Sequence, residues 1–231
     1  MKIGVFSDSH YSSKEISCGV RYNSKSLEKI INAYQYFNQE KCELIICLGD
    51  LIDTEPTTKK VLENLDKIAD VINSVDIKTV CLRGNHDAFA LTKDEFYNTL
   101  RLDEPKDIET NGTYLLFLDA CYFKNGKSYS KGDDDWTDTF YPFEALLEER
   151  LKKLKGNVYI FIHQSIDPTV DGECRLFNAD KLFDIINKSG KVKTVFQGHY
   201  HVGCVSNYNG VEYVTLPAMC QNDKAFYVYE L

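Results

Sequence analysis

Short apolar runs alternate with amphipathic segments along the amino-terminal part of the chain. The runs 2–7, 43–48 and 78–82 have the length and composition of buried strands. Between them, apolar residues recur at three- and four-residue spacing over 26–39 and 58–73, which predicts two helices that each bury one face. This alternation predicts parallel strands joined by right-handed crossovers, and therefore an α/β fold.

The alternation continues, less regularly, through the middle of the chain. A polar stretch over 121–141 carries Asp133-Asp134-Asp135 and Trp136, and we interpret it as a solvated surface loop at the rim of a pocket. The elements expected around this loop are a short helix from Lys93, a strand over 113–118, a helix over 143–155, a strand over 157–162, a helix over 178–188 and a strand over 192–196.

The pattern changes in the carboxyl-terminal part of the chain. Short apolar segments over 202–207, 211–216 and 225–229 replace the strand–helix alternation. The pair Asn209-Gly210 lies between the first two segments and is typical of a tight β-hairpin turn. We therefore expect this region to be largely antiparallel β-structure.

Composition limits the classes of protein to which the chain can belong. Its 231 residues are 43% hydrophobic and no linker interrupts them, so we expect one domain over 1–231. A formal net charge of −8 argues against nucleic acid as a partner, because phosphate backbones require a basic face. A small phosphorylated substrate fits better. The sequence carries no indication of an oligomeric state.

The distribution of apolar residues and cysteines indicates the cellular compartment. The opening apolar run is too short for a secretion signal, and no run reaches the length of a membrane-spanning helix. Four of the eight cysteines, Cys42, Cys47, Cys81 and Cys121, lie in or beside apolar runs, and no C-x-x-C pair occurs. Buried reduced thiols are the better interpretation, and we expect a soluble cytoplasmic protein without membrane contact.

The histidines all lie directly after predicted strands. A single histidine in a loop is usually a surface residue or a capping group, but five in equivalent positions favour a shared function. Because ligands collect at the carboxyl ends of parallel strands, we expect these side chains to meet there. The group consists of His10, His86, His163, His199 and His201, together with Asp8, Asp50 and Asn85.

These residue types indicate a metal centre. Imidazole and carboxylate groups without thiolates suit Mn, Fe or Zn better than Mg or Ca. Even seven of these groups would be too many for one ion, whereas two ions roughly 3.5 to 4 Å apart can share a bridging carboxylate. Two divalent or mixed-valence ions lower the pKa of a bridging water enough to form hydroxide near neutral pH, which favours in-line attack on phosphorus.

Five ordered motifs between residues 8 and 201 resemble those of the calcineurin-like metallophosphoesterase superfamily. The resemblance implies a four-layer α/β/β/α sandwich with a mixed two-sheet core. It also implies that Asp50 bridges two ions, that His86 contacts the phosphoryl group and protonates the leaving oxygen, and that the other ligands divide into two sets. The motifs are Asp8-x-His10, Gly49-Asp50, Gly84-Asn85-His86-Asp87, His163 and Gly198-His199-x-His201. The implied sets are Asp8, His10 and His201 for the first ion, and Asn85, His163 and His199 for the second.

Asp87 and Arg21 each have two interpretations. Asp87 either orients the ring of His86 or caps the start of a helix or turn. Arg21 either clamps a second phosphate, as a guanidinium does well, or is a solvated loop residue. The surrounding Arg21-Tyr22 pattern is similar to that of the ADP-ribose/CDP-alcohol diphosphatase-like and cyclic-nucleotide phosphodiesterase-like branches, so Arg21 is the candidate substrate-binding residue.

Two positions depart from the protein Ser/Thr phosphatase branch of the same superfamily. Thr54 stands where that branch has arginine, and Asp87 where it has glutamate. We therefore expect a phosphoesterase that cleaves a phosphodiester or pyrophosphate bond of a small, nucleotide-containing substrate by attack of a metal-bound hydroxide. The alternatives are a phosphomonoesterase or nuclease of the same fold, or a catalytically silent binding scaffold.

Overall fold

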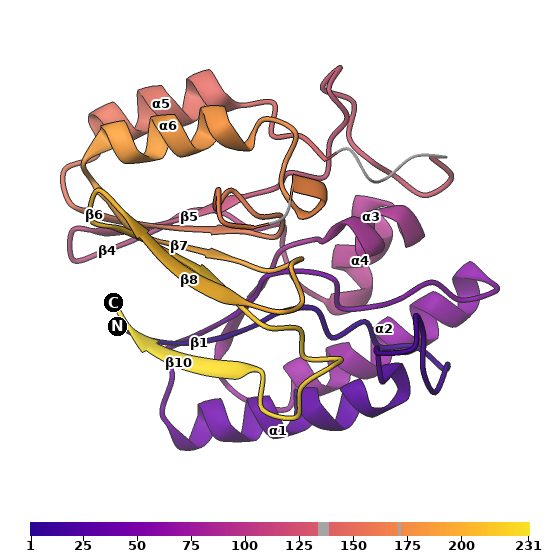
Figure 1. The fold of residues 1–231 in the computed structure, drawn as a ribbon. Helices are drawn as coiled ribbons and strands as arrows, with labels where there is room; N and C mark the ends of the chain where they lie inside the picture. Colours follow the sequence, from indigo (N-terminus) through magenta and orange to yellow (C-terminus); the bar gives the residue numbers. More distant parts are fainter. Residues whose placement is uncertain (134–138, 171) are drawn as a thin grey trace.

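The computed structural model describes residues 1–133, 139–170 and 172–231, and these form four layers. Figure 1 shows two β-sheets packed face to face, with helices on both outer faces. This arrangement confirms the α/β/β/α sandwich that the motifs implied. Among the residues described, no helix has both the length and the apolar character needed to span a bilayer.

The first sheet has four strands in the order β10-β1-β2-β3. The first three strands of the chain run parallel to one another, as predicted, and β10 lies antiparallel to β1. The strands are β1 (Lys2–Phe6), β2 (Leu44–Cys47), β3 (Lys78–Cys81) and β10 (Phe226–Glu230). The helices α1 (Ser26–Gln39), α2 (Thr58–Ile72) and α4 (Lys93–Leu100) supply apolar side chains to the core on the outer face of this sheet.

The second sheet has six strands in the order β4-β5-β6-β7-β9-β8. Its strands are β4 (Ile108–Thr110), β5 (Thr113–Leu118), β6 (Asn157–Ile162), β7 (Val192–Gln197), β8 (Cys204–Tyr208) and β9 (Val211–Thr215). The helices α5 (Glu144–Lys153) and α6 (Ala179–Ser189) cover its outer face. The described elements also include two short 3₁₀ turns, η1 (Asn23–Lys25) and η2 (Gly172–Cys174).

The carboxyl-terminal strands are only partly antiparallel. The predicted hairpin exists: Asn209 and Gly210 have φ angles of 52° and 80°, and β8 pairs antiparallel with β9. However, β9 lies parallel to β7, so the expectation of a largely antiparallel region is wrong at this pairing. The physical reason is that the chain reverses direction twice, once between β7 and β8 and once at the hairpin between β8 and β9. The second reversal returns β9 to the direction of β7.

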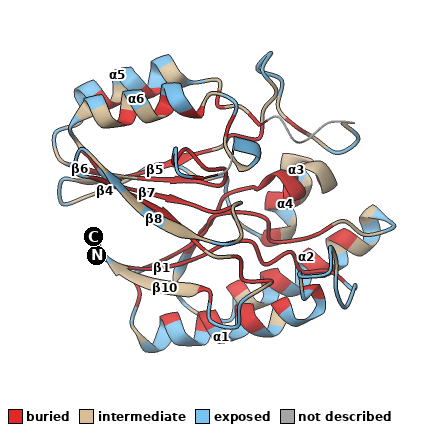
Figure 2. Cartoon of the chain, viewed as in Figure 1, coloured by how far each residue is buried: buried red, intermediate tan, exposed pale blue. Residues whose placement is uncertain are grey.

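The core between the sheets is apolar and aromatic. Phe117, Phe161 and Phe196 lie on neighbouring strands, and their rings stack with centroid distances of 5.2 Å and 5.1 Å. Residues such as Ile46 and Leu48 from the first sheet pack against them. Figure 2 shows that burial is concentrated on the strands and on the helix faces that meet them. Each such side chain contributes about 1.5–3 kcal/mol to folding, so this core fixes how the two sheets lie on each other.

Three local features differ from expectation. The segment after Gly84 forms a helix, α3 (Asn85–Ala90), instead of only a turn, and β4 was not foreseen. The polar loop is not wholly solvated, because Cys121 and Tyr129 are buried against Ala88. The polar composition of the loop did not indicate this burial, because a few apolar side chains are enough to pack a loop against the rest of the protein. Asp134, Asp135 and Trp136 lie outside the described residues.

Candidate active site

The predicted ligands lie where strands of both sheets end. Asp8 and His10 follow β1, Asp50 follows β2, and Asn85 is the first residue of the helix after β3. His163 comes directly after β6, and His199 and His201 follow β7. The face-to-face packing of the sheets brings these ends together. The site is therefore shared by two sheets that meet at one edge.

Several of these residues have left-handed backbone conformations. The φ angles are 56° at Asp8, 44° at His10, 51° at Asp50 and 64° at His199. Such conformations cost a residue with a side chain about 1 kcal/mol, and strain of this kind gathers at functional sites. They turn the chain sharply at the end of each strand, so that consecutive side chains face the same centre.

The glycines of the motifs make room for carboxylates. A Cβ atom on Gly84 would lie 2.1 Å from Oδ1 of Asp50, and one on Gly198 would lie 2.6 Å from Oδ2 of Asp8. Both distances are far below van der Waals contact. The glycines are therefore needed because each carboxylate passes directly over a neighbouring backbone.

Asp50 lies between the two predicted ligand sets. Its Oδ1 accepts a hydrogen bond from the backbone N–H of His86 at 2.9 Å, which fixes the carboxylate. Its Oδ2 lies 3.5 Å from Nε2 of His10 and 3.3 Å from Nε2 of His163. One oxygen thus faces both sets, which is the arrangement a bridging ligand requires.

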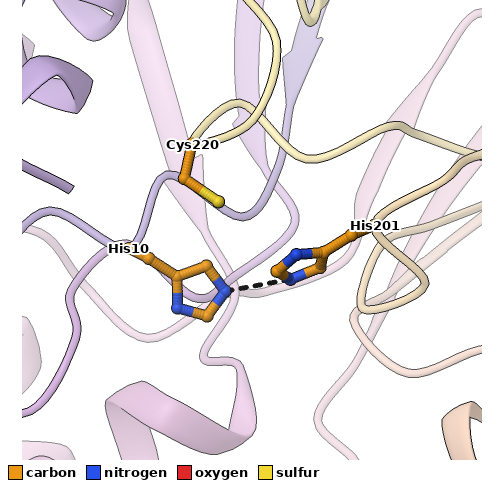
Figure 3. Close-up of side chains that lie close together, drawn as sticks. All are labelled: His10, His201 and Cys220. Atoms are coloured by element: carbon orange, nitrogen blue, oxygen red, sulfur yellow. Dashed lines mark hydrogen bonds between the residues drawn. The ribbon is translucent and has the colours of Figure 1, made fainter. Parts of the chain in front are cut away.

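The first predicted set is compact. Oδ1 of Asp8 lies 3.8 Å from Nε2 of His10 and 3.5 Å from Nε2 of His201. The two ring nitrogens are 3.1 Å apart, and Figure 3 shows them facing one another. Oδ2 of Asp8 accepts from the backbone N–H of His199 at 3.1 Å, so Oδ1 is the oxygen left to bind an ion.

The second predicted set surrounds the other side of Asp50. Ligand atoms of Asp50, His163 and His199 all lie within 4.8 Å of one another. Nδ1 of His163 lies 3.1 Å from the carbonyl oxygen of Leu48, so this nitrogen donates and Nε2 is presented to the site. Asn85 is buried at the start of α3, where its side-chain oxygen is available.

The electrostatics keep the carboxylates charged and two imidazoles neutral. Burial lowers the pKa of His10 to about 4 and that of His199 to about 3. Burial opposes the charged form of Asp8, yet the adjacent imidazoles of His10 and His201 hold its pKa well below its usual range. Burial likewise disfavours protonated His163, but the Asp50 carboxylate outweighs it and raises the pKa to about 9.

These residues fit a pair of metal ions. Oδ1 of Asp8, Oδ1 of Asn85 and Nε2 of His163 are buried and have no hydrogen-bond partner among the described residues. Unpaired buried polar atoms are costly, and a cation bound there would satisfy all three. The donors are imidazole, carboxylate and amide groups, which suit transition metals. The sequence therefore named residues that the structure brings together, while their roles as ligands stay predictions.

His86 lies at the edge of this cluster, close to two charged groups. Its Nδ1 is 3.4 Å from Oδ1 of Asp53, and its Nε2 is 3.4 Å from Nη1 of Arg21. Burial alone would raise the pKa of Asp53, but the hydrogen bond and charge of His86 hold it below its usual range. Arg21 also lies 3.8 Å from Oδ2 of Asp53, so it is held at the site and is not a solvated loop arginine.

Asp87 does not orient the ring of His86. Its carboxylate accepts hydrogen bonds from the backbone N–H groups of Gly84 at 2.9 Å, Ile52 at 3.1 Å and Leu51 at 3.3 Å. It therefore caps α3 and ties the loop after β2 to the loop after β3. Of the two interpretations, the helix-start carboxylate is the correct one, and Asp53 occupies the orienting position.

We predict that Asp53→Asn lowers kcat about ten- to a hundredfold, a part of the about 10²–10⁴-fold that a general acid contributes. The amide carries no charge, and its NH₂ group, which can only donate, replaces one of the two carboxylate oxygens, so the ring of His86 is held less firmly. Metal content should stay unchanged. Asp70→Asn, at an exposed carboxylate paired with Arg101, is the matched control. Full activity of the Asp53 variant would contradict this role.

Sequence reasoning missed three residues at the site. Asp53 had a usable signal, because it lies three residues after Asp50 in the same loop. Cys220 lies with His10 and His201 in a group whose ligand atoms are all within 4.8 Å of one another. The side-chain amide of Gln221 lies 2.8 Å from Nδ1 of His201. Neither Cys220 nor Gln221 belongs to a motif, so spacing alone could not have found them.

Residues 1–203 match the family model described as calcineurin-like phosphoesterase. A serine/threonine-protein phosphatase, CPPED1 from Pongo abelii, is 29% identical over 84% of this chain and 64% of its own length. A 3',5'-cyclic-nucleotide phosphodiesterase from Nostoc sp. is 28% identical over 77% of this chain and 63% of its own length. The chain thus spans somewhat less than two thirds of these curated relatives.

Solved structures share the fold at low sequence identity. A dimetal phosphatase from Danio rerio superposes with a TM-score of 0.83 at 16% identity, covering 100% of this chain and 92% of its own. The protein TT1561 from Thermus thermophilus gives a TM-score of 0.60 at 12% identity, covering 95% and 90%. At these identities the likeness supports the fold alone.

Proposed function

Because the chain belongs to the calcineurin-like phosphoesterase family, we propose that it is a binuclear-metal hydrolase of phosphodiester or pyrophosphate bonds in a small, nucleotide-containing substrate. The family match covers residues 1–203, and membership of this family indicates a hydrolase of phosphoric esters. The observation that carries the two-metal proposal is the position of Asp50, whose Oδ2 lies within 3.5 Å of His10 and 3.3 Å of His163.

The proposed ligands divide as the motifs implied. Two bound Mn, Fe or Zn ions would stabilise charge on the phosphoryl oxygens and activate a water molecule. Asp50 would serve both positions, because its Oδ2 faces both His10 and His163. The first ion would be held by Asp8, His10 and His201, and the second by Asn85, His163 and His199.

His86 and Arg21 would act on the substrate itself. Asp53 holds Nδ1 of the His86 ring, which directs Nε2 toward the guanidinium of Arg21 at 3.4 Å. Nε2 is then placed to give a proton to the leaving oxygen, while Arg21 binds a phosphoryl oxygen or a second phosphate. Binding of a second phosphate by Arg21 would favour a pyrophosphate or nucleotide over a simple monoester.

A phosphomonoesterase is the second candidate function. CPPED1 is named a serine/threonine-protein phosphatase, whereas Thr54 and Asp87 depart from the pattern of the larger protein phosphatase branch. A nuclease is disfavoured by the net charge of −8, and a silent scaffold by the convergence of all seven ligand candidates with His86.

Rates on two chromogenic substrates with Mn test the proposal. We expect bis-p-nitrophenyl phosphate, a diester, to be hydrolysed faster than p-nitrophenyl phosphate, a monoester. The reason is that His86 and Arg21 are proposed to act on a phosphoryl group that carries a second substituent. A screen of ADP-ribose, CDP-alcohols and cyclic nucleotides with each metal then identifies the substrate class. Cleavage of the monoester alone would overturn the proposal in favour of a phosphomonoesterase.

A further inference from the structure

The loop between β9 and β10 is anchored directly to the first set of proposed ligands. The backbone N–H of Met219 donates to the carbonyl oxygen of Ser7, and that of Cys220 donates to the carbonyl oxygen of Asp8, both at 3.0 Å. These bonds attach the loop to the segment that follows β1 and carries Asp8 and His10. The loop lies beyond residue 203, where the family match ends.

The side chain of Cys220 points toward the histidines of that set. Figure 3 shows its sulfur directed at the space beside His10 and His201. A ligand nitrogen of each ring and Sγ of Cys220 all lie within 4.8 Å of one another, and Cys220 is fully buried. One ion could therefore contact all three groups with small side-chain movements.

Two neighbouring side chains also indicate a cation at this position. Oδ1 of Asp8 is fully buried, lies 3.5 Å from Nε2 of His201, and has no hydrogen-bond partner within the described ranges. Gln221, the residue after Cys220, places its side-chain amide 2.8 Å from Nδ1 of His201. With the amide turned so that its oxygen accepts from Nδ1–H, the ring is held with an unprotonated Nε2 facing inward. The same loop thus supplies a thiol and orients a histidine ligand.

We propose that Cys220 is a further ligand of the ion held by Asp8, His10 and His201, an inference that rests on the binuclear site proposed above. As the sulfur–metal bond forms, the S–H bond breaks and its proton goes to solvent, with no change of oxidation state. A thiolate is a soft ligand, so this position favours Zn or Fe over Mn. The second position, built from oxygen and nitrogen donors, accepts Mn.

The other cysteine near the site provides a matched control. Cys121 is buried, but its Sγ donates to the carbonyl oxygen of Arg83 at 3.4 Å and lies 3.8 Å from the amide of Gln164. Its thiol is therefore engaged by protein atoms. Cys18, which is exposed, controls for metal bound at the surface.

Absorption spectroscopy of the full chain loaded with Co²⁺ tests the proposal. Wild-type protein should show a near-ultraviolet thiolate-to-cobalt charge-transfer band, which Cys220→Ser should lose and which Cys121→Ser and Cys18→Ser should retain. In competition between Zn and Mn for the protein, Cys220→Ser should lose about tenfold or more of the preference for Zn. Mutating a residue that only supports a metal ligand already lowers metal affinity by about that factor.

X-ray absorption of Zn-loaded wild-type protein gives an answer that does not depend on any variant folding. A sulfur scatterer at about 2.3 Å from zinc supports the assignment. Zinc bound only by nitrogen and oxygen, or a charge-transfer band that survives in Cys220→Ser, would overturn it while leaving the binuclear hydrolase intact. Failure to bind any of these metals would overturn the proposed function and this inference together.

Discussion

The Asp50→Asn variant is expected to hold fewer than one metal ion per chain and to lose activity by at least ~10²–10³-fold, the effect of removing a charge-stabilising group. An amide preserves the shape of the side chain, and its oxygen can still accept from the backbone N–H of His86. The NH₂ group then replaces Oδ2 and faces the rings of His10 and His163. A donor at that position cannot bind a cation, so both ion positions weaken together.

Elemental analysis and thermal unfolding measure this loss independently of activity. Added Mn should stabilise the wild-type protein, by about 2.7 kcal/mol at a concentration of 100 times Kd, because it binds only the folded state. The Asp50→Asn protein should show little of this stabilisation. Asp184→Asn makes the same chemical change at an exposed residue of α6 and should behave as wild type. Two ions retained by the Asp50 variant would contradict the bridging role.

The His86→Ala variant should keep both metal ions and lose about 10²–10⁴-fold in kcat, the usual contribution of a general acid. Protonation matters little for p-nitrophenolate, which leaves readily, and matters greatly for an alkyl or ribose oxygen. The loss should therefore be larger on a nucleotide substrate than on bis-p-nitrophenyl phosphate. Comparing the two substrates separates protonation of the leaving oxygen from general damage to the site.

The metal content of this variant also decides between two roles for His86. A ligand atom of His86 lies within 4.8 Å of ligand atoms of His10 and Asp50, so the three could hold an ion between them. The ring of His86 also meets that of His10 edge-on, with a centroid distance of 4.6 Å. Loss of one ion in His86→Ala would make His86 a ligand, whereas two ions with low activity support the assignment to the substrate.

The sequence predicted which side chains lie together, because strand ends are predictable. An apolar run that stops at a polar residue marks the end of a strand, and parallel strands place such ends together, which is why His163 and His199 could be grouped with Asp8 from spacing alone. The left-handed conformations at those ends are not visible in the sequence. They arise from tertiary contacts such as the close passage of Asp50 over Gly84.

Side-chain partners across loops were harder to predict. Asp87 is adjacent to His86 in sequence, yet its carboxylate turns to backbone N–H groups, and Asp53 from another loop reaches the ring. Cys220 reaches the site only because its backbone is tied to the segment after β1. Such contacts depend on how loops fold over one another, and local periodicity carries no information about them.

The residues with left-handed backbone conformations at the strand ends lower the stability of the fold, while their side chains are the ones proposed to serve the reaction. At positions 8, 10, 50 and 199, glycine would adopt the same backbone without the steric cost, which is about 1 kcal/mol for other residues. A selection for heat resistance alone would thus tend to replace the proposed ligands, whereas a selection for turnover would retain them. Paired mutational scans of abundance and hydrolysis should therefore diverge most at these four positions, and that divergence would trace the reaction centre from sequence variants alone.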